Sequence, residues 1–85
     1  NMTREEIMKT INQAENYYNT LAVRWSTIFA EMMANETSMD RYRELEEEVS
    51  ATLRMMKDVR RTIHEYEEKL KKAIFQMKIN SKTKE

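Results

Sequence analysis

The 85-residue chain lacks glycine, proline and cysteine altogether. Glycine permits left-handed turns and phosphate-binding loops, and proline kinks helices, so their absence removes the common interruptions of helical structure. Without cysteine the chain forms no disulfide bond and offers no thiolate to a metal, which fits a reducing compartment. We therefore expect long, unbroken helices in a cytoplasmic protein.

Long apolar runs are also missing, because no stretch reaches about 18 apolar residues and no signal-peptide core is present. We expect that this segment neither spans a membrane nor carries an export leader. The 15 basic residues balance the 15 acidic ones, so no net field draws the molecule onto nucleic acid or membranes. Residues 1–40 hold three basic and six acidic residues, hence −3, and residues 41–85 hold twelve and nine, hence +3. An antiparallel arrangement would bring these opposite charges together.

Charged residues make up 35% of the chain, hydrophobic residues 40% and aromatic residues only 8%. This composition is typical of long helices and coiled coils, so we predict an all-α fold. A chain of this length forms one domain, residues 1–85, and leaves much of its surface in water unless it oligomerises or binds a partner.

The strongest pattern is a seam of mostly apolar residues from Tyr42 to Met77, spaced alternately by three and four. Thr52 is its one polar member. A helix of this length, about 54 Å, cannot bury such a seam alone. Its members are Tyr42, Leu45, Val49, Thr52, Met56, Val59, Ile63, Tyr66, Leu70, Ala73 and Met77.

The first helix has its own start signal and its own seam. Thr3 and Glu6 have the spacing of a capping box, and Met2 and Ile7 that of a hydrophobic staple. Flanking apolar residues make the stripe wider than one partner helix covers, which favours a four-helix bundle. The seam comprises Ile7, Ile11, Ala14, Tyr18, Leu21, Trp25, Ile28 and Met32, and the flanking residues are Met8, Tyr17, Ala22, Phe29 and Met33.

Small polar residues interrupt the pattern only between Ala34 and Asp40. Asn35 suits the left-handed end of a helix, and Thr37 is the predicted cap of the next one. So short a link favours an antiparallel, coiled-coil-like hairpin with Ile7 near Glu67. The predicted elements are a helix over residues 3–34, a turn over 35–38, a helix over 39–79 and a disordered tail over 80–85.

The second predicted helix extends about ten residues beyond the first turn of the first helix. Apolar residues there have no cover within the chain, so they predict a partner site, unless this end merely frays. Methionine, with 8 residues, suits surfaces that adapt to a partner. The predicted partner-binding residues are Leu70, Ala73, Ile74, Phe75, Met77, Tyr17, Met33 and Met55, and Ile79 lies in the same extension.

Nothing in the sequence indicates catalysis. His64 is the only histidine, so neither a His-Glu-x-x-His zinc motif nor paired Glu-x-x-His di-iron motifs can form. The glutamates at residues 44–48 are in helical register, unlike the ligands of a calcium loop. Interleaved glutamates also argue against nucleic-acid binding by the basic C-terminal half. We therefore predict no catalytic, cofactor-binding or metal-binding residues, and no enzyme.

The polar turn that leads into Asp40-x-Tyr42 and then a long amphipathic helix resembles the small α-hairpin co-chaperones of type III secretion needle proteins. The similarity extends from about Glu5 to Ile63 and concerns size, two-helix architecture and the tyrosine after the turn. It implies a hairpin that packs against a helical-repeat chaperone and keeps the needle subunit from polymerising early. The longer C-terminal extension and the heavier charge depart from that pattern.

These patterns predict a non-enzymatic helical protein-protein interaction module, such as a co-chaperone or adaptor. The expected partner is another helical protein or a second copy of the chain. Two alternatives remain open at this point, a coiled-coil oligomerisation segment of a larger structural protein and a nucleic-acid-binding helical protein.

Overall fold

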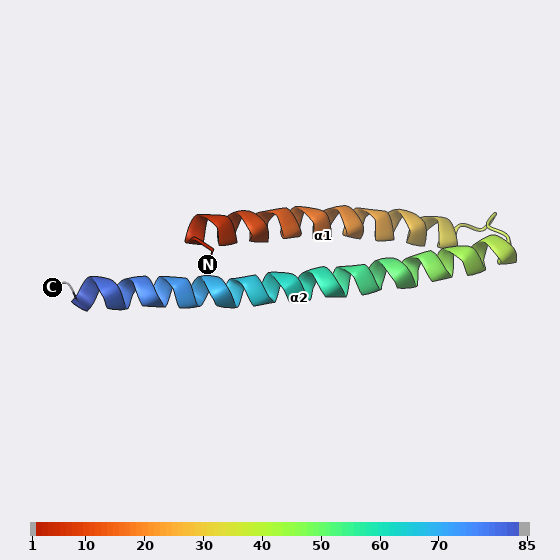
Figure 1. Ribbon diagram of the computed structural model, residues 1–85. Helices are drawn as coiled ribbons and strands as arrows, with labels where there is room; N and C mark the ends of the chain where they lie inside the picture. Colours follow the sequence, from red (N-terminus) through yellow and green to blue (C-terminus); the bar gives the residue numbers. More distant parts are fainter. Residues whose placement is uncertain (1, 84–85) are drawn as a thin grey trace.

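The computed structural model describes residues 2–83 and contains two α-helices. Helix α1 (Arg4–Met33) and helix α2 (Met39–Thr83) pack antiparallel as an extended hairpin (Figure 1). The predicted all-α hairpin is therefore confirmed.

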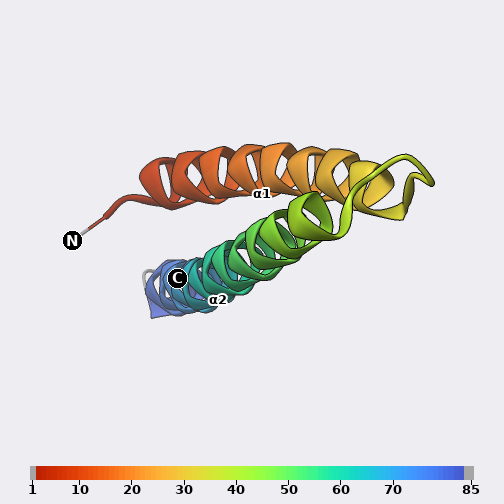
Figure 2. The ribbon, with the colours of Figure 1, turned by 90° about the vertical axis from the view of Figure 1, so that its right-hand side faces the viewer.

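The hairpin is a rod of 70 × 16 × 14 Å with a radius of gyration of 19.7 Å. A compact domain of this length would have a radius of gyration of about 12 Å. Both views show the two helices side by side, and no third element covers either of them within residues 2–83 (Figure 2). Each helix therefore presents most of its circumference to solvent.

The capping box at the start of α1 is confirmed. The Thr3 N–H donates to the Glu6 carboxylate at 2.9 Å, and the Glu6 N–H donates to Thr3 Oγ1 at 3.1 Å. Two hydrogen bonds with Thr3 lower the pKa of Glu6: the bond from the Thr3 N–H has the larger effect and the bond with its hydroxyl the smaller one. The ionised carboxylate is thus the form that caps the helix.

The turn differs from its prediction in two details. No residue from 2 to 83 has a positive φ, so Asn35 is not left-handed, and α1 instead ends at an extended Ala34. Ser38, and not Thr37, caps α2, because Ser38 Oγ accepts from the Arg41 N–H at 3.1 Å. The Thr37 hydroxyl donates to the Glu31 carbonyl at the end of α1 and is therefore engaged elsewhere.

An ion pair across the turn joins the two helices. The guanidinium of Arg41 donates to both carboxylate oxygens of Glu31, at 2.8 and 3.2 Å, and to Glu44 at 3.1 Å. The bond from Arg41 lowers the pKa of Glu31, and the two carboxylates raise the pKa of Arg41. Bidentate geometry fixes the register of the helices at this end.

The predicted seams form the contact between the helices. Every seam residue of α1 is buried or half-buried, and so is every seam residue of α2 except Met77, which is exposed. The buried centre is Leu45 with Ile28 and Val49, against which Trp25 and Met32 pack. Thr52 is buried too, and its hydroxyl donates to the Glu48 carbonyl at 2.8 Å, so the polar seam position is satisfied.

The register at the far end of the hairpin is shifted from the predicted one. Ile7 and Met2 line one groove with Lys69, Lys72, Ala73 and Gln76, whereas Glu67 lines another groove with Glu15 and Asn19. The start of α1 thus lies nearer the end of α2 than expected.

Helix α2 also continues to Thr83, so the predicted tail is wrong for residues 80–83. The Gln76 side chain donates to that of Asn80 at 3.0 Å, and Lys82 suits the negative end of the helix dipole. Polar residues without glycine or proline do not stop a helix. Residues 84–85 of that predicted tail lie outside the described residues.

Candidate protein-interaction surfaces

The C-terminal part of α2, residues 69–82, lies beside the first turn of α1 and continues past it, and is here called the open end (Figure 1). Its apolar side chains lie on two faces. Leu70, Ala73 and Ile74 are half-buried beside α1, so their partial burial needs no second chain, contrary to the prediction. Phe75, by contrast, is 65% exposed. Phe75 and Ile79 are four residues apart and share one side of the helix, and Met77 is exposed as well.

The open end is strongly basic. It contains five lysines and no acidic residue, hence +5: Lys69, Lys71, Lys72, Lys78 and Lys82. Lys69 lies over the ring of Tyr66 at 4.6 Å, and Lys71 pairs with Glu68 at 3.2 Å on the helix surface. The bond from Lys71 lowers the pKa of Glu68. Such exposed contacts contribute little, so most of this positive charge faces solvent.

The opposite end of the rod, residues 29–48, is here called the turn end. It contains seven acidic and two basic residues, hence −5. Met33 and Met39 are 64% and 65% exposed, and Phe29, stacked on Trp25 with centroids 5.1 Å apart, is 38% exposed. The turn end therefore also combines exposed apolar side chains with a charge of one sign.

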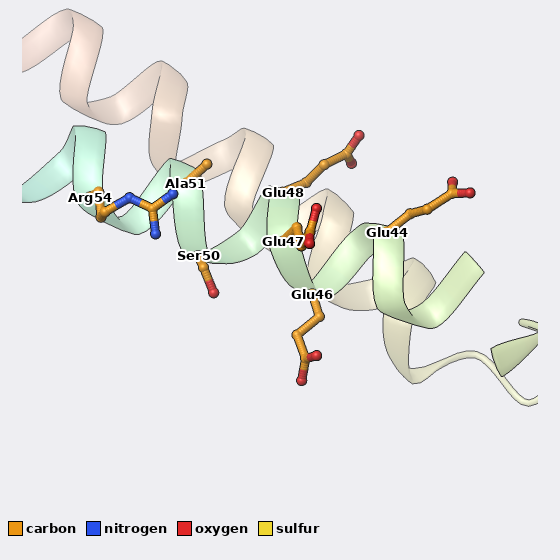
Figure 3. Close-up of a pocket in the computed structure, with 7 residues that line it drawn as sticks. All are labelled: Glu44, Glu46, Glu47, Glu48, Ser50, Ala51 and Arg54. Carbon is orange, nitrogen blue, oxygen red and sulfur yellow. The ribbon is translucent and has the colours of Figure 1, made fainter. Parts of the chain in front are cut away.

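The acidic residues of α2 line an open groove on the surface of the helix. Figure 3 shows that Glu44 and Glu48 point to one side of the helix and Glu46 to the other, along an open groove that Ser50, Ala51 and Arg54 also line. Within residues 2–83 no three His, Cys, Asp or Glu side chains are placed to hold a metal ion. The glutamates form a solvated face.

The middle of the rod carries a contact that the sequence pattern did not indicate. Arg60 of α2 lies over the ring of Tyr18 of α1, 5.1 Å from its centroid, and donates to the Tyr18 hydroxyl. Periodicity places Tyr18 on the seam but does not identify a cation opposite it. Leu53 lies beside this pair and is 40% exposed. It was not among the predicted partner-binding residues, because it is not part of the seam and periodicity gives no signal for it.

The eight predicted partner-binding residues do not form one patch. Leu70, Ala73, Ile74, Phe75 and Met77 belong to the open end, whereas Met33 is the last residue of α1 at the turn end. Tyr17 and Met55 are exposed and lie between these ends. The predicted set thus extends over most of the length of a 70 Å rod.

No protein-family model, curated protein or solved structure matches the chain. Within residues 2–83, neither helix combines the length and the apolar character that crossing a membrane requires.

Proposed function

We propose that the chain is a non-enzymatic helical protein-protein interaction module, which binds a helical protein or a second copy through its exposed apolar side chains. The observation that carries this proposal is the open end, where Phe75 is 65% exposed and has Met77 and Ile79 exposed nearby. Helix α1 packs on the seam of α2 and leaves Phe75 exposed on another side, so this side is open to a further helix.

The energetic reason is the area that the rod leaves in water. Burying a Phe, Met or Ile side chain contributes about 1.5 to 3 kcal/mol relative to leaving it exposed. Exposed single residues are ordinary on protein surfaces, but apolar side chains grouped at one helix end favour an interface.

A narrower form of the proposal is a co-chaperone like those of type III secretion needle proteins. Its support is the two-helix hairpin together with Tyr42, which follows the turn and is half-buried at the start of α2. This form predicts that the apolar surface packs against a helical-repeat chaperone. Binding of the purified chain to such a chaperone, and loss of that binding on Phe75→Ala, is the measurement that separates it from the general proposal.

The general proposal is tested by placing a photoreactive phenylalanine analogue at Phe75 in the intact protein, in the cells that produce it. We expect a discrete cross-linked adduct, either with a second copy or with a helical protein, identified by mass spectrometry. The matched control carries the same analogue at Gln13, an exposed polar position on α1, and should give none. No adduct at Phe75, or equal adducts at both positions, would contradict an interaction surface at the open end.

A further inference from the structure

We propose that the partner is a second copy of the chain, docked antiparallel along the rod so that the turn end of each copy covers the open end of the other. This inference rests on the proposed function, since it names the occupant of the same apolar surface. Three observations carry it: the charge of the two ends, the area that each docking mode can bury, and a line of residues on α2.

Charge is segregated along the rod. The turn end, residues 29–48, has a net charge of −5, the open end, residues 69–82, has +5, and the stretches between them, residues 10–28 and 49–68, each sum to zero. Along α2, residue 46 and residue 78 are separated by about 48 Å, far beyond the Debye length of about 8 Å in physiological salt. The two ends of one copy therefore cannot neutralise each other.

An antiparallel second copy neutralises both ends at once. A two-fold axis brings the turn end of one copy onto the open end of the other and repeats the contact, so the assembly closes as a dimer. Parallel docking would instead place −5 on −5 and +5 on +5, and like charges across an interface are costly. Charge alone thus selects the antiparallel direction.

Area selects side-by-side docking over end-to-end docking. The cross-section of the rod is 16 × 14 Å, so an end-to-end contact covers roughly 220 Å². A strip about 10 Å wide along the 70 Å rod covers roughly 700 Å². A stable interface buries about 800 Å² per partner, which only the lateral contact approaches.

One side of α2 carries the residues that such a contact requires. Glu46, Leu53 and Lys78 are 7 and 25 residues apart, about 1.9 and 6.9 turns, so they lie nearly in line along the helix. Full antiparallel overlap of two α2 helices, Met39–Thr83, sets Glu46 level with residue 76, between Phe75 and Lys78 of the other copy. Each overlap thus pairs a carboxylate with a lysine beside an exposed aromatic ring.

Cross-linking tests the direction directly, because the 85-residue chain has no cysteine. The single variants Glu46→Cys and Lys78→Cys are purified, mixed and treated with a short bis-maleimide cross-linker. We expect the mixed dimer to be the main product. Homodimers of Glu46→Cys as the main product would show parallel docking and overturn the inference, while leaving the interaction module itself intact.

Charge exchange tests the pairing. Glu46→Lys and Lys78→Glu should each raise the dimer dissociation constant about tenfold or more, because each puts like charges together twice in the dimer. The double variant should recover to within about threefold of the parent. Glu48→Lys is the matched control: it changes net charge equally at the same end, but Glu48 points to the other side of α2 (Figure 3), and it should have a much smaller effect.

The remaining outcomes separate this inference from the proposed function. A chain that stays monomeric at high-micromolar concentration, yet gives a heterologous adduct at Phe75, overturns self-docking and keeps the interaction module. Monomeric behaviour with no adduct overturns both. Growth into filaments would show end-to-end docking and would also overturn the antiparallel dimer.

Discussion

The first third of α2 and the rest of that helix have the same seam pattern but not the same burial. All three fully buried positions of α2, Leu45, Val49 and Thr52, lie in its first third, whereas no residue from 53 to 82 is buried to that degree. The turn end also has the bidentate ion pair between Glu31 and Arg41. An apolar pattern therefore predicts which residues can be buried, but the packing of the other helix decides their degree of burial.

The strongest test of this contrast is Leu45→Ala. Leu45 is completely inaccessible to solvent, so its truncation removes packed apolar area and leaves a cavity. We expect the free energy of unfolding to fall by about 2 to 5 kcal/mol, measured by urea denaturation followed by circular dichroism. The control Val23→Ala, at a site on α1 that is 68% exposed, should cost roughly 1 kcal/mol or less. Equal losses at both sites would remove the distinction between them.

The open end is tested by Ile74→Ala combined with Phe75→Ala. Because Phe75 is exposed within one copy, we expect helix content to stay near that of the parent while association weakens. Sedimentation velocity and circular dichroism measure the two properties on the same samples. Val23→Ala, which alters an exposed residue on α1, is the control. Unchanged association would move the search for the interface to Tyr17, Met33 and Met55.

The N-caps of the two helices offer a smaller test, of local stability at the start of each helix. Ser38→Ala removes the oxygen that accepts from the Arg41 N–H, and we expect a loss of about 1 kcal/mol in the free energy of unfolding. Thr3→Ala at the start of α1 should cost a similar amount, because it breaks the capping box. Thermal melts of both variants measure the effect. A loss below the error of the melt for Ser38→Ala would mean that the turn end is fixed by the ion pair and the core instead.

The smallest expected effect is a pH dependence at the turn. The bond from Arg41 lowers the folded-state pKa of Glu31 below its ordinary value of 4.5. A lowered folded-state pKa stabilises the fold above the unfolded-state pKa, and the contribution is lost as pH falls through the folded-state value. We expect stability to decline below about pH 4.5, and Glu31→Gln to decline less steeply. Identical slopes for parent and variant in acid titrations would exclude a contribution from this pair. High salt should reduce the contribution of the pair between Glu31 and Arg41 to stability.

Local patterns in the sequence were enough to predict the two helices and the side on which each helix faces the other. The capping box at Thr3 and both seams, apart from the exposed Met77, are as predicted, because hydrogen-bonding caps and helical periodicity depend on neighbouring residues alone. Of the apolar residues predicted to lie beyond the cover of α1, Phe75, Met77 and Ile79 are exposed, whereas Leu70, Ala73 and Ile74 are half-buried beside α1. Whether they bind a partner stays a prediction.

Tertiary structure decided what depends on the position of one helix against the other. The register that sets Ile7 beside Lys69 and Ala73, and the contact between Tyr18 and Arg60, come from side-chain packing across the hairpin, which periodicity does not encode. Ser38 caps α2 because the Thr37 hydroxyl instead donates to the Glu31 carbonyl near the end of α1. The rod shape then holds the acidic and basic ends apart, because an antiparallel hairpin of two long helices leaves each end of α2 at an opposite end of the molecule.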